Sequence, residues 1–385
     1  MTEQAGNFSR KILPGAITLV IGGAGILLVI GALAAGQDWL DRHFLPLFFF
    51  PREKIVAQES LVRAGCGALG LVLIFFLRPA MVRAARRMTP GAFLAASARM
   101  LFAIGLAFGA SELLLARKFA YAAAEGPLKE EPMRRPDPLL GWTFVPAHQG
   151  EASAGGRNIA YATDSHGYRV QPGAAVNTDG PTILFTGESI MAGYGLAWEE
   201  TIPAQVTALM NIQGANMAVH GYANDQAYLR LKAELPRFRK PVALVSLFTP
   251  SLFARNLGDD RPHLGPGLDW HPAVHRWRLS ALFRFLVPYH SEAEIEQGIA
   301  ATRAVLQASA ELARRHHVTA LVVDPQFGPE SPVERMLRRR ILDEGGISYL
   351  RVDLDPAWRL KGDMHPSPQA ARVIAAAITG RLRTP

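Results

Sequence analysis

The sequence predicts an α/β protein with a doubly wound parallel sheet, preceded by three apolar helices long enough to cross a membrane. Two observations lead to this prediction. From Pro181 onward, short apolar runs alternate with helix-like stretches, which is the pattern of a parallel sheet with helices on both faces. Before residue 119 the chain is rich in Gly, Ala, Leu and Ile and holds three long apolar stretches, as membrane helices do.

The three apolar stretches are the expected membrane spans, at residues 13–36, 61–82 and 94–116. The first carries no charge and can cross a hydrocarbon core of roughly 30 Å. The second spans the core if Arg63 and Arg78 reach the two interfaces. The third is apolar apart from Arg99 and Glu112. A secretory signal peptide fits the first stretch poorly, because the run is too long and two more candidate spans follow.

Basic residues in the loops predict how these spans are oriented. The segment from Arg78 to Arg99 holds five arginines and no acidic residue, whereas the loop between spans one and two mixes both signs. We therefore expect the arginine-rich segment in the cytoplasm and everything after Ala116 outside it, although Arg117 and Lys118 weigh against this. The expectation is a multi-pass protein of the cell inner membrane, in contact with the lipid bilayer, with its folded domain on the periplasmic side.

The chain divides into a transmembrane region at 1–118, a linker rich in Pro, Glu and Arg at 119–136, and an α/β domain at 137–385. Two short extended segments open the domain, at residues 137–142 and 158–168. Parallel strands are expected at residues 182–186, 215–219, 242–248, 318–323 and 347–352. Helices are expected from an N-cap at Thr201, over 292–315, and from about 369 to 382. Residues 251–289 interrupt the alternation and are expected to overhang a site.

Composition excludes several functions. The net charge of +8 comes largely from single arginines, and no basic stripe is interleaved with aromatic residues, so we expect no nucleic-acid partner. The only cysteine, Cys66, cannot form an intrachain disulfide, and no Cys/His spacing suits zinc. We expect neither a metal nor a cofactor.

Two short motifs carry the chemistry. The run Gly187-Glu188-Ser189 follows an apolar strand, at the end where open α/β sheets bind their ligands. Asp363 and His365 lie near the C-terminus. A serine, a histidine and an aspartate can act as nucleophile, general base and orienting acid. The sequence therefore predicts an enzyme with Ser189, His365 and Asp363 as its catalytic residues.

With these residues in place, residues 137–385 resemble the SGNH (GDSL-like) hydrolases, and specifically their membrane-attached members. The resemblance implies a flavodoxin-like sheet and a serine esterase site built from spaced blocks. Glu188 stands where that family usually has Asp. Gly221 matches the second block, whose backbone N–H forms the oxyanion hole together with that of Ser189.

One departure from the family pattern stands out. The third block normally supplies an Asn side chain to the oxyanion hole, but residues 247–251 contain no Asn. Either another group substitutes, or the protein is a weak or altered catalyst. Glu188, Tyr194, Asn224 and Thr249 are the candidate substrate contacts near this point.

Three functions are compatible with these residues. The first is a membrane-anchored serine esterase that acts on O-acyl esters, chiefly O-acetyl esters, of envelope or exported glycans or lipids. The second is an O-acyltransferase that decorates exported polysaccharide, because the same acyl-enzyme can pass its acyl group to a sugar hydroxyl; a membrane acyl-donor protein would then be its partner. The third is a non-catalytic glycan-binding or scaffold protein, supported by the missing Asn.

The orientation can be tested with alkaline phosphatase fusions, which are active only outside the cytoplasm. A fusion at Glu125 is expected to be active and one at Arg86 inactive. The opposite pattern would invert the topology and with it the choice of substrates.

Overall fold

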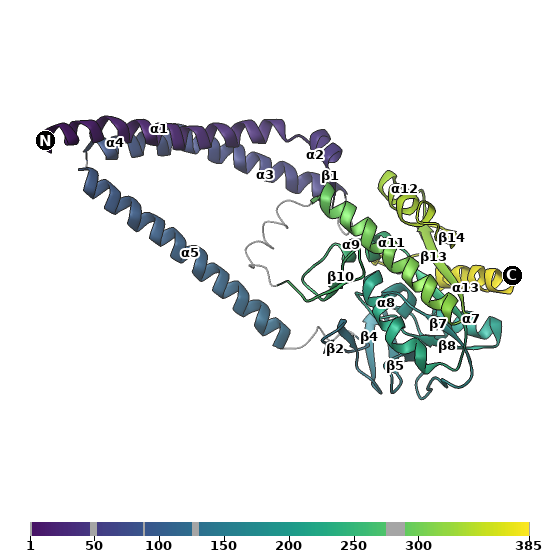
Figure 1. Cartoon of the computed structure of the whole chain (residues 1–385). Coiled ribbons are helices and arrows are strands. Elements are labelled where there is room, and N and C mark those ends of the chain that lie inside the picture. Colours follow the sequence, from purple (N-terminus) through teal and green to yellow (C-terminus); the bar gives the residue numbers. More distant parts are fainter. Residues whose placement is uncertain (1, 47–51, 88, 125–130, 275–288, 385) are drawn as a thin grey trace. The chain divides into compact units, whose positions relative to one another are not determined.

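The computed structural model describes residues 2–46, 52–87, 89–124, 131–274 and 289–384. The chain forms two compact units, which are described separately (Figure 1). The helical unit comprises residues 1–124 and 276–292, and the sheet unit comprises residues 125–275 and 293–385. The last helix of the helical unit continues to Ala124, so residues 119–124 of the expected linker are helical. Residues 125–130 of that linker lie outside the described residues.

The helical unit contains three helices that are long and apolar enough to span a membrane, at Pro14–Ala34, Arg52–Arg87 and Leu94–Arg117. Its elements are α1 (Thr2–Ala34), α2 (Gln37–His43), α3 (Arg52–Val72), a π-helical turn (Leu73–Leu77), α4 (Arg78–Arg87) and α5 (Pro90–Ala124). The second span is longer than predicted, because α3, the π-helical turn and α4 follow one another directly. A short strand β1 (Phe44–Pro46) pairs antiparallel with β12 (Tyr289–Ser291).

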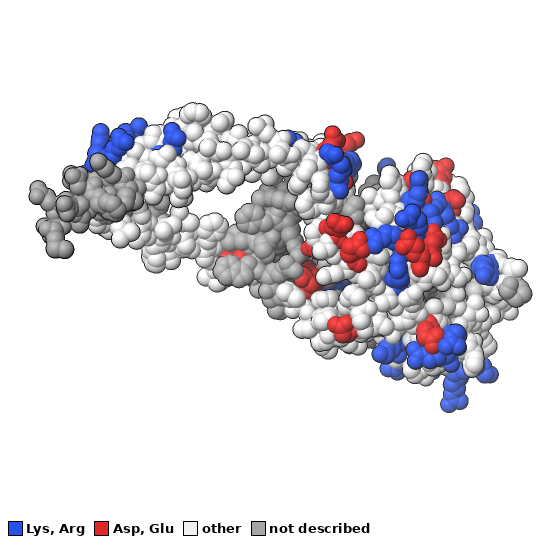
Figure 2. Space-filling model, turned by 45° about the horizontal axis from the view of Figure 1, so that its top comes forward, with Lys and Arg blue, Asp and Glu red and all other residues white. Residues whose placement is uncertain are grey.

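The two units differ in surface chemistry. In the face shown in Figure 2, the long helices of the helical unit are mostly white, meaning that few Lys, Arg, Asp or Glu side chains line them. Blue and red side chains are interspersed over the sheet unit. This mixture of signs is that of an ordinary water-exposed surface.

The sheet unit is built on eight strands in the order β14-β13-β9-β7-β8-β6-β5-β4. Five of them are parallel: β7 (Pro181–Phe185), β8 (Gln213–Asn216), β9 (Lys240–Leu247), β13 (Thr319–Phe327) and β14 (Tyr349–Leu354). Numbered along the chain, these five have the order 2-1-3-4-5 of flavodoxin-like sheets. The predicted doubly wound parallel sheet is therefore confirmed.

Helices cover both faces of this sheet. Leu184 and Leu244 pack in one cluster with Leu231 and Ala313, which come from α8 (Asn224–Glu234) and α11 (Glu292–Arg315). Alternate residues of the same strands pack in a second cluster that includes residues of α7 (Ile202–Met210) and α13 (Pro368–Arg383). The expected helices are confirmed, with Thr201 capping α7 through a bond from the Ala204 N–H. Strands that are apolar along their whole length need cover on both faces, and these helices provide it.

Three antiparallel strands extend the sheet beyond the predicted five. They are β6 (Arg169–Val170), β5 (Arg157–Thr163) and β4 (Gln149–Ala154), and β6 joins them to β8. A separate hairpin is formed by β2 (Arg134–Asp137) and β3 (Gly141–Phe144). The sequence showed two extended segments here without indicating that one of them joins the sheet.

Strand β8 ends earlier than the predicted strand at 215–219. The chain nevertheless continues along the end of β7, because Met217 N–H donates to the Phe185 carbonyl at 2.9 Å and Val219 N–H to the Gly187 carbonyl at 3.3 Å. These bonds hold the chain beside β7 up to the turn at Gly221.

The remaining described elements are short. They are α6 (Ser189–Ala192), α9 (Pro250–Asn256), β10 (His263–Leu264), β11 (Trp270–His271), α12 (Pro332–Arg338), 3₁₀ turns at Trp198–Glu200 and Leu235–Arg237, and a π-helical turn at Arg339–Asp343.

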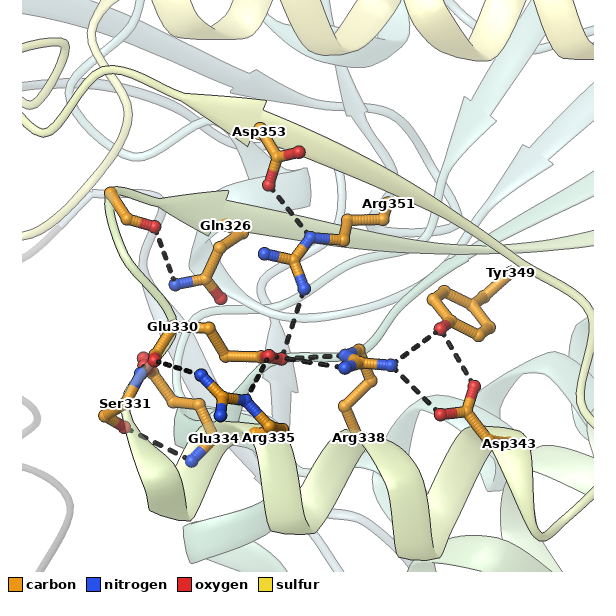
Figure 3. Close-up of polar contacts among 11 residues, drawn as sticks. Gln326, Glu330, Ser331, Glu334, Arg335, Arg338, Asp343, Tyr349, Arg351 and Asp353 are labelled. Atoms are coloured by element: carbon orange, nitrogen blue, oxygen red, sulfur yellow. Dashed lines mark hydrogen bonds and ion pairs between the residues drawn. The ribbon is translucent and has the colours of Figure 1, made fainter.

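A cluster of ion pairs supports the β13–β14 edge of the sheet (Figure 3). The Glu330 carboxylate, 8% exposed, accepts from Arg335 at 3.3 Å, Arg338 at 2.7 Å and Arg351 at 3.2 Å. The hydrogen bond from Arg338 is the largest cause that holds the pKa of Glu330 below its usual range. Three arginines on one carboxylate tie α12 to β14 at this edge.

Asp324, on β13, carries an unfavourable buried charge. Burial raises its pKa to about 6, against the opposing effect of Arg351 and Arg338. The folded protein therefore binds this proton more tightly than the unfolded chain, so stability is lost as pH rises from about 4 towards 6.

Asp324→Asn is expected to raise the free energy of unfolding near neutral pH by about 2 kcal/mol, because the neutral amide avoids the buried charge. Thermal unfolding of the detergent-solubilised chain is measured at about pH 7.5 and about pH 4.5, with the exposed Asp260→Asn as control. The shift for Asp324→Asn appears at the higher pH and is small at the lower. Equal shifts at both would contradict the assigned burial effect.

Candidate active site

Ser189 lies where the sheet presents its ligand-binding edge. It begins α6 after the short turn that follows β7, which is strand 1 of the order 2-1-3-4-5, at the point where successive connections leave towards opposite faces. Gly187 has φ +146°, and a Cβ there would lie 3.3 Å from side-chain atoms of Leu247 and Met191. The glycine therefore allows the tight turn that presents Ser189.

The structure brings Ser189, His365 and Asp363 together. The distance from Ser189 Oγ to His365 Nε2 is 2.7 Å, and that from His365 Nδ1 to Asp363 Oδ1 is 2.5 Å. His365 and Asp363 are half-buried, with 24% and 31% of their side chains exposed, and Ser189 is buried. This is the hydrogen-bond chain of a nucleophile, a base and an orienting carboxylate.

The close spacing of Asp363 and His365 has a local explanation. Asp363 Oδ1 accepts both the backbone N–H of His365, at 2.8 Å, and its ring Nδ1. Met364 between them is 72% exposed, so the side chains on either side turn the opposite way. The loop is closed by Leu360 N–H, which donates to the His365 carbonyl at 2.8 Å, and Ser367 then caps α13.

The environment of Asp363 keeps it ionised. Burial alone would raise the pKa of Asp363, but hydrogen bonds from the backbone and ring of His365 outweigh it and hold this pKa below its usual value. A carboxylate with a lowered pKa stays charged at neutral pH, where it can stabilise a protonated imidazole.

Tyr194 and Gly221 flank the three residues. The Tyr194 ring lies against the His365 ring, with centroids 4.4 Å apart. Gly221 has φ +80°, and a Cβ there would lie 3.3 Å from Trp142 and 3.4 Å from Arg134. Trp142 Nε1 donates to the His220 carbonyl at 2.9 Å, so the β2–β3 hairpin forms a wall beside Gly221 that sequence reasoning missed.

Asn224 and Thr249 have structural hydrogen bonds. Asn224 Nδ2 donates to the Leu247 carbonyl at 3.1 Å, and the residue is 4% exposed. Thr249 Oγ1 caps α9 by accepting from Leu252 N–H at 3.2 Å. Each side chain thereby supports the turn that follows β9.

Glu188 and Arg255 form an ion pair beside Ser189. Glu188 is 2% exposed, and its Oε2 accepts from the Ser189 hydroxyl at 2.6 Å and from Arg255 Nη1 at 2.9 Å. Arg255 comes from α9, within the 251–289 segment that was expected to overhang the site. Residues 275–288 of that segment lie outside the described residues. Sequence reasoning missed Arg255, because a single arginine on a short helix carries no motif.

Within the described ranges, no three His, Cys, Asp or Glu side chains gather in a way that could hold a metal ion.

Comparison with known proteins gives similar solved structures. No protein-family model matches this sequence, and no curated protein sequence matches it. A protein assigned to the G-D-S-L lipolytic family from Desulfitobacterium hafniense is 15% identical, with 54% of this chain and 99% of that chain covered and a TM-score of 0.33. An acetyl xylan esterase from Butyrivibrio proteoclasticus is 11% identical, with 55% and 65% covered and a TM-score of 0.34.

A family two carbohydrate esterase from Clostridium thermocellum, solved in complex with cellohexaose, is 12% identical, with 55% and 66% covered and a TM-score of 0.35. Similarities of this size carry no argument about the fold or the function of this chain. The strand order 2-1-3-4-5 and the positions of Ser189, Gly221 and the Asp363–His365 pair agree with the blocks expected from the sequence. The sheet unit therefore has the flavodoxin-like strand order that the sequence predicts.

Proposed function

We propose that this chain is a membrane-anchored serine esterase that hydrolyses O-acyl esters, chiefly O-acetyl esters, of envelope or exported glycans or lipids. The observation that carries the proposal is the continuous hydrogen-bond chain from Ser189 Oγ through His365 to Asp363, with distances of 2.7 and 2.5 Å. These are the contacts that a base-activated serine requires.

The first half of the reaction forms an acyl-enzyme. His365 Nε2 takes the proton of Ser189 while Ser189 Oγ bonds to the ester carbonyl carbon. Asp363 holds the ring and stabilises the positive charge that develops on it. His365 then gives the proton to the departing alcohol as the ester C–O bond breaks. In the second half, His365 removes a proton from water as the water oxygen bonds to the acyl carbon. The bond from that carbon to Ser189 Oγ then breaks, His365 returns the proton to Ser189 Oγ, and the acid is released.

Backbone N–H groups of Ser189 and Gly221 are the proposed oxyanion donors. Among the residues that the structure describes, neither N–H donates a hydrogen bond, so both are available to a substrate oxygen. Ser189 is also the first residue of its short helix, where backbone N–H groups lack intrahelical partners.

The burial of Ser189 and the apolar helices support the proposed substrate class. Ser189 is only 5% exposed, which suits a small acyl group such as acetyl better than a long chain. The three described helices that are long and apolar enough to span a membrane support attachment of the chain to the bilayer. With the catalytic unit outside the cytoplasm of an inner-membrane protein, as the basic loop predicts, acylated glycans and lipids of the envelope are within its reach.

Ser189→Ala is expected to abolish turnover of p-nitrophenyl acetate and labelling by a fluorophosphonate probe, because it removes the nucleophilic oxygen. The fold is expected to persist, since the side chain contributes no apolar packing. The thermal unfolding midpoint of the mutant serves as control. Wild-type turnover that survives unchanged in the mutant would exclude Ser189 as the nucleophile, and a wild type without any turnover or labelling would favour a binding protein.

Gly221→Ala is expected to lower kcat on the order of 100-fold, because φ +80° strains any residue with a Cβ and the added methyl group would press on Trp142 at 3.3 Å. Slow hydrolysis is expected even in the wild type, since the usual Asn donor is missing. Asn224→Ala and Thr249→Val are compared under the same conditions and are expected to act mainly on stability, through the turn after β9. If Gly221→Ala is nearly silent and Asn224→Ala is crippling, Asn224 is the missing donor instead.

A further inference from the structure

The hydroxyl of Ser189 lies between two acceptors. Its Oγ is 2.6 Å from Glu188 Oε2 and 2.7 Å from His365 Nε2. A serine hydroxyl has one proton and can donate to only one of them at a time. Only donation to His365 leads to attack on an ester, because the base must take this proton. Donation to Glu188 therefore holds the nucleophile in an unproductive state.

Arg255 acts on the same oxygen atom. Its Nη1 lies 2.9 Å from Glu188 Oε2, the oxygen that the Ser189 hydroxyl contacts, and 3.4 Å from the Tyr222 carbonyl. Tyr222 directly follows Gly221, so the guanidinium bridges the turns after β7 and β8. Arg255 itself comes from the helix after β9, the place where the usual Asn is missing. One arginine thus joins all three turns that surround the nucleophile.

The charge of Glu188 would otherwise oppose the reaction. A carboxylate that is 2% exposed is poorly screened by water. Beside Ser189 it competes for the hydroxyl proton, and it repels the negative charge that develops on the substrate oxygen. A guanidinium on the same carboxylate oxygen weakens both effects, because it neutralises the charge and competes for the acceptor lone pairs.

We propose that Arg255 is a positioning residue of this site, which neutralises Glu188 so that the Ser189 proton passes to His365 and an oxyanion can form nearby. This inference rests on the proposed esterase function and deepens it. Together, Glu188 and Arg255 then place little net charge beside Ser189, as a neutral side chain at position 188 would. Arg255 acts through Glu188 and does not itself need to touch the substrate.

The test is a charge-rescue experiment on the full-length protein in detergent, with p-nitrophenyl acetate as the substrate. Arg255→Gln is expected to lower kcat on the order of 100-fold with KM changed by about twofold or less, because the loss affects the transition state. Arg255→Lys keeps the positive charge and is expected to retain more activity than Arg255→Gln. The double variant Glu188→Gln/Arg255→Gln removes both charges and is expected to recover at least about tenfold over Arg255→Gln.

Arg239→Gln is the matched control, because Arg239 is 79% exposed and pairs with Asp179 at 2.9 Å on the surface. It is expected to leave kcat unchanged. A double variant as inactive as Arg255→Gln would overturn the proposal and make Arg255 a direct oxyanion donor. Activity of Arg255→Gln within about twofold of the wild type would also overturn it.

The test also covers a variant that does not fold and a failure of the esterase function itself. If Arg255→Gln does not fold, Arg255→Lys and the double variant Glu188→Gln/Arg255→Gln can still be compared with the wild type, because the first keeps a positive charge beside Glu188 and the second removes the carboxylate. A double variant below Arg255→Lys by more than about 100-fold would then contradict the proposal. Failure of the esterase function itself is recognised separately, as wild-type turnover that does not depend on Ser189.

Discussion

The site depends on the two hydrogen bonds that His365 donates to Asp363. One carboxylate oxygen accepts both the backbone N–H and the ring Nδ1 of the same histidine, at 2.8 and 2.5 Å. Two bonds to one atom fix the ring in position as well as in tautomer, and they turn Nε2 towards Ser189. The rest of the sheet unit supports this arrangement, because β7 presents Ser189 and the loop after β14 returns His365 to it.

A second constraint comes from the residue before the nucleophile. Glu188 has a longer side chain than the Asp usual in this block, and its carboxylate reaches back to the Ser189 hydroxyl at 2.6 Å. A buried negative charge at this point needs a partner, since an unpaired one costs several kcal/mol. Arg255 provides it from the helix after β9, at 2.9 Å. Glu188 and the absence of an Asn at residues 247–251 can thus be explained together, because the helix that begins in this segment provides the arginine that pairs with Glu188.

Much of this fold could be predicted from the sequence, because apolar runs and caps are local signals. Thr201 and the pattern at 292–315 located two helices. The motifs at Ser189 and His365 indicated that the ends of β7 and β14 contribute to one site. The antiparallel strands at 149–170 were missed as part of the sheet, because short strands carry little pattern and their pairing is non-local. Arg255 and the wall formed by Trp142 were missed for the same reason, since a contact between distant segments leaves no trace in residue spacing.

The measurement that tests the central claim most directly is acid quenching of the full-length protein during turnover of p-nitrophenyl acetate, followed by peptide mass spectrometry. The account predicts one acetyl group on the peptide that contains Ser189 in the wild type, and loss of this adduct when His365 is replaced by Ala, because no base then takes the serine proton. The adduct is expected to disappear in Ser189→Ala. An acetyl group on another residue, or an adduct that still forms at the wild-type rate in Ser189→Ala, would contradict nucleophilic attack by Ser189.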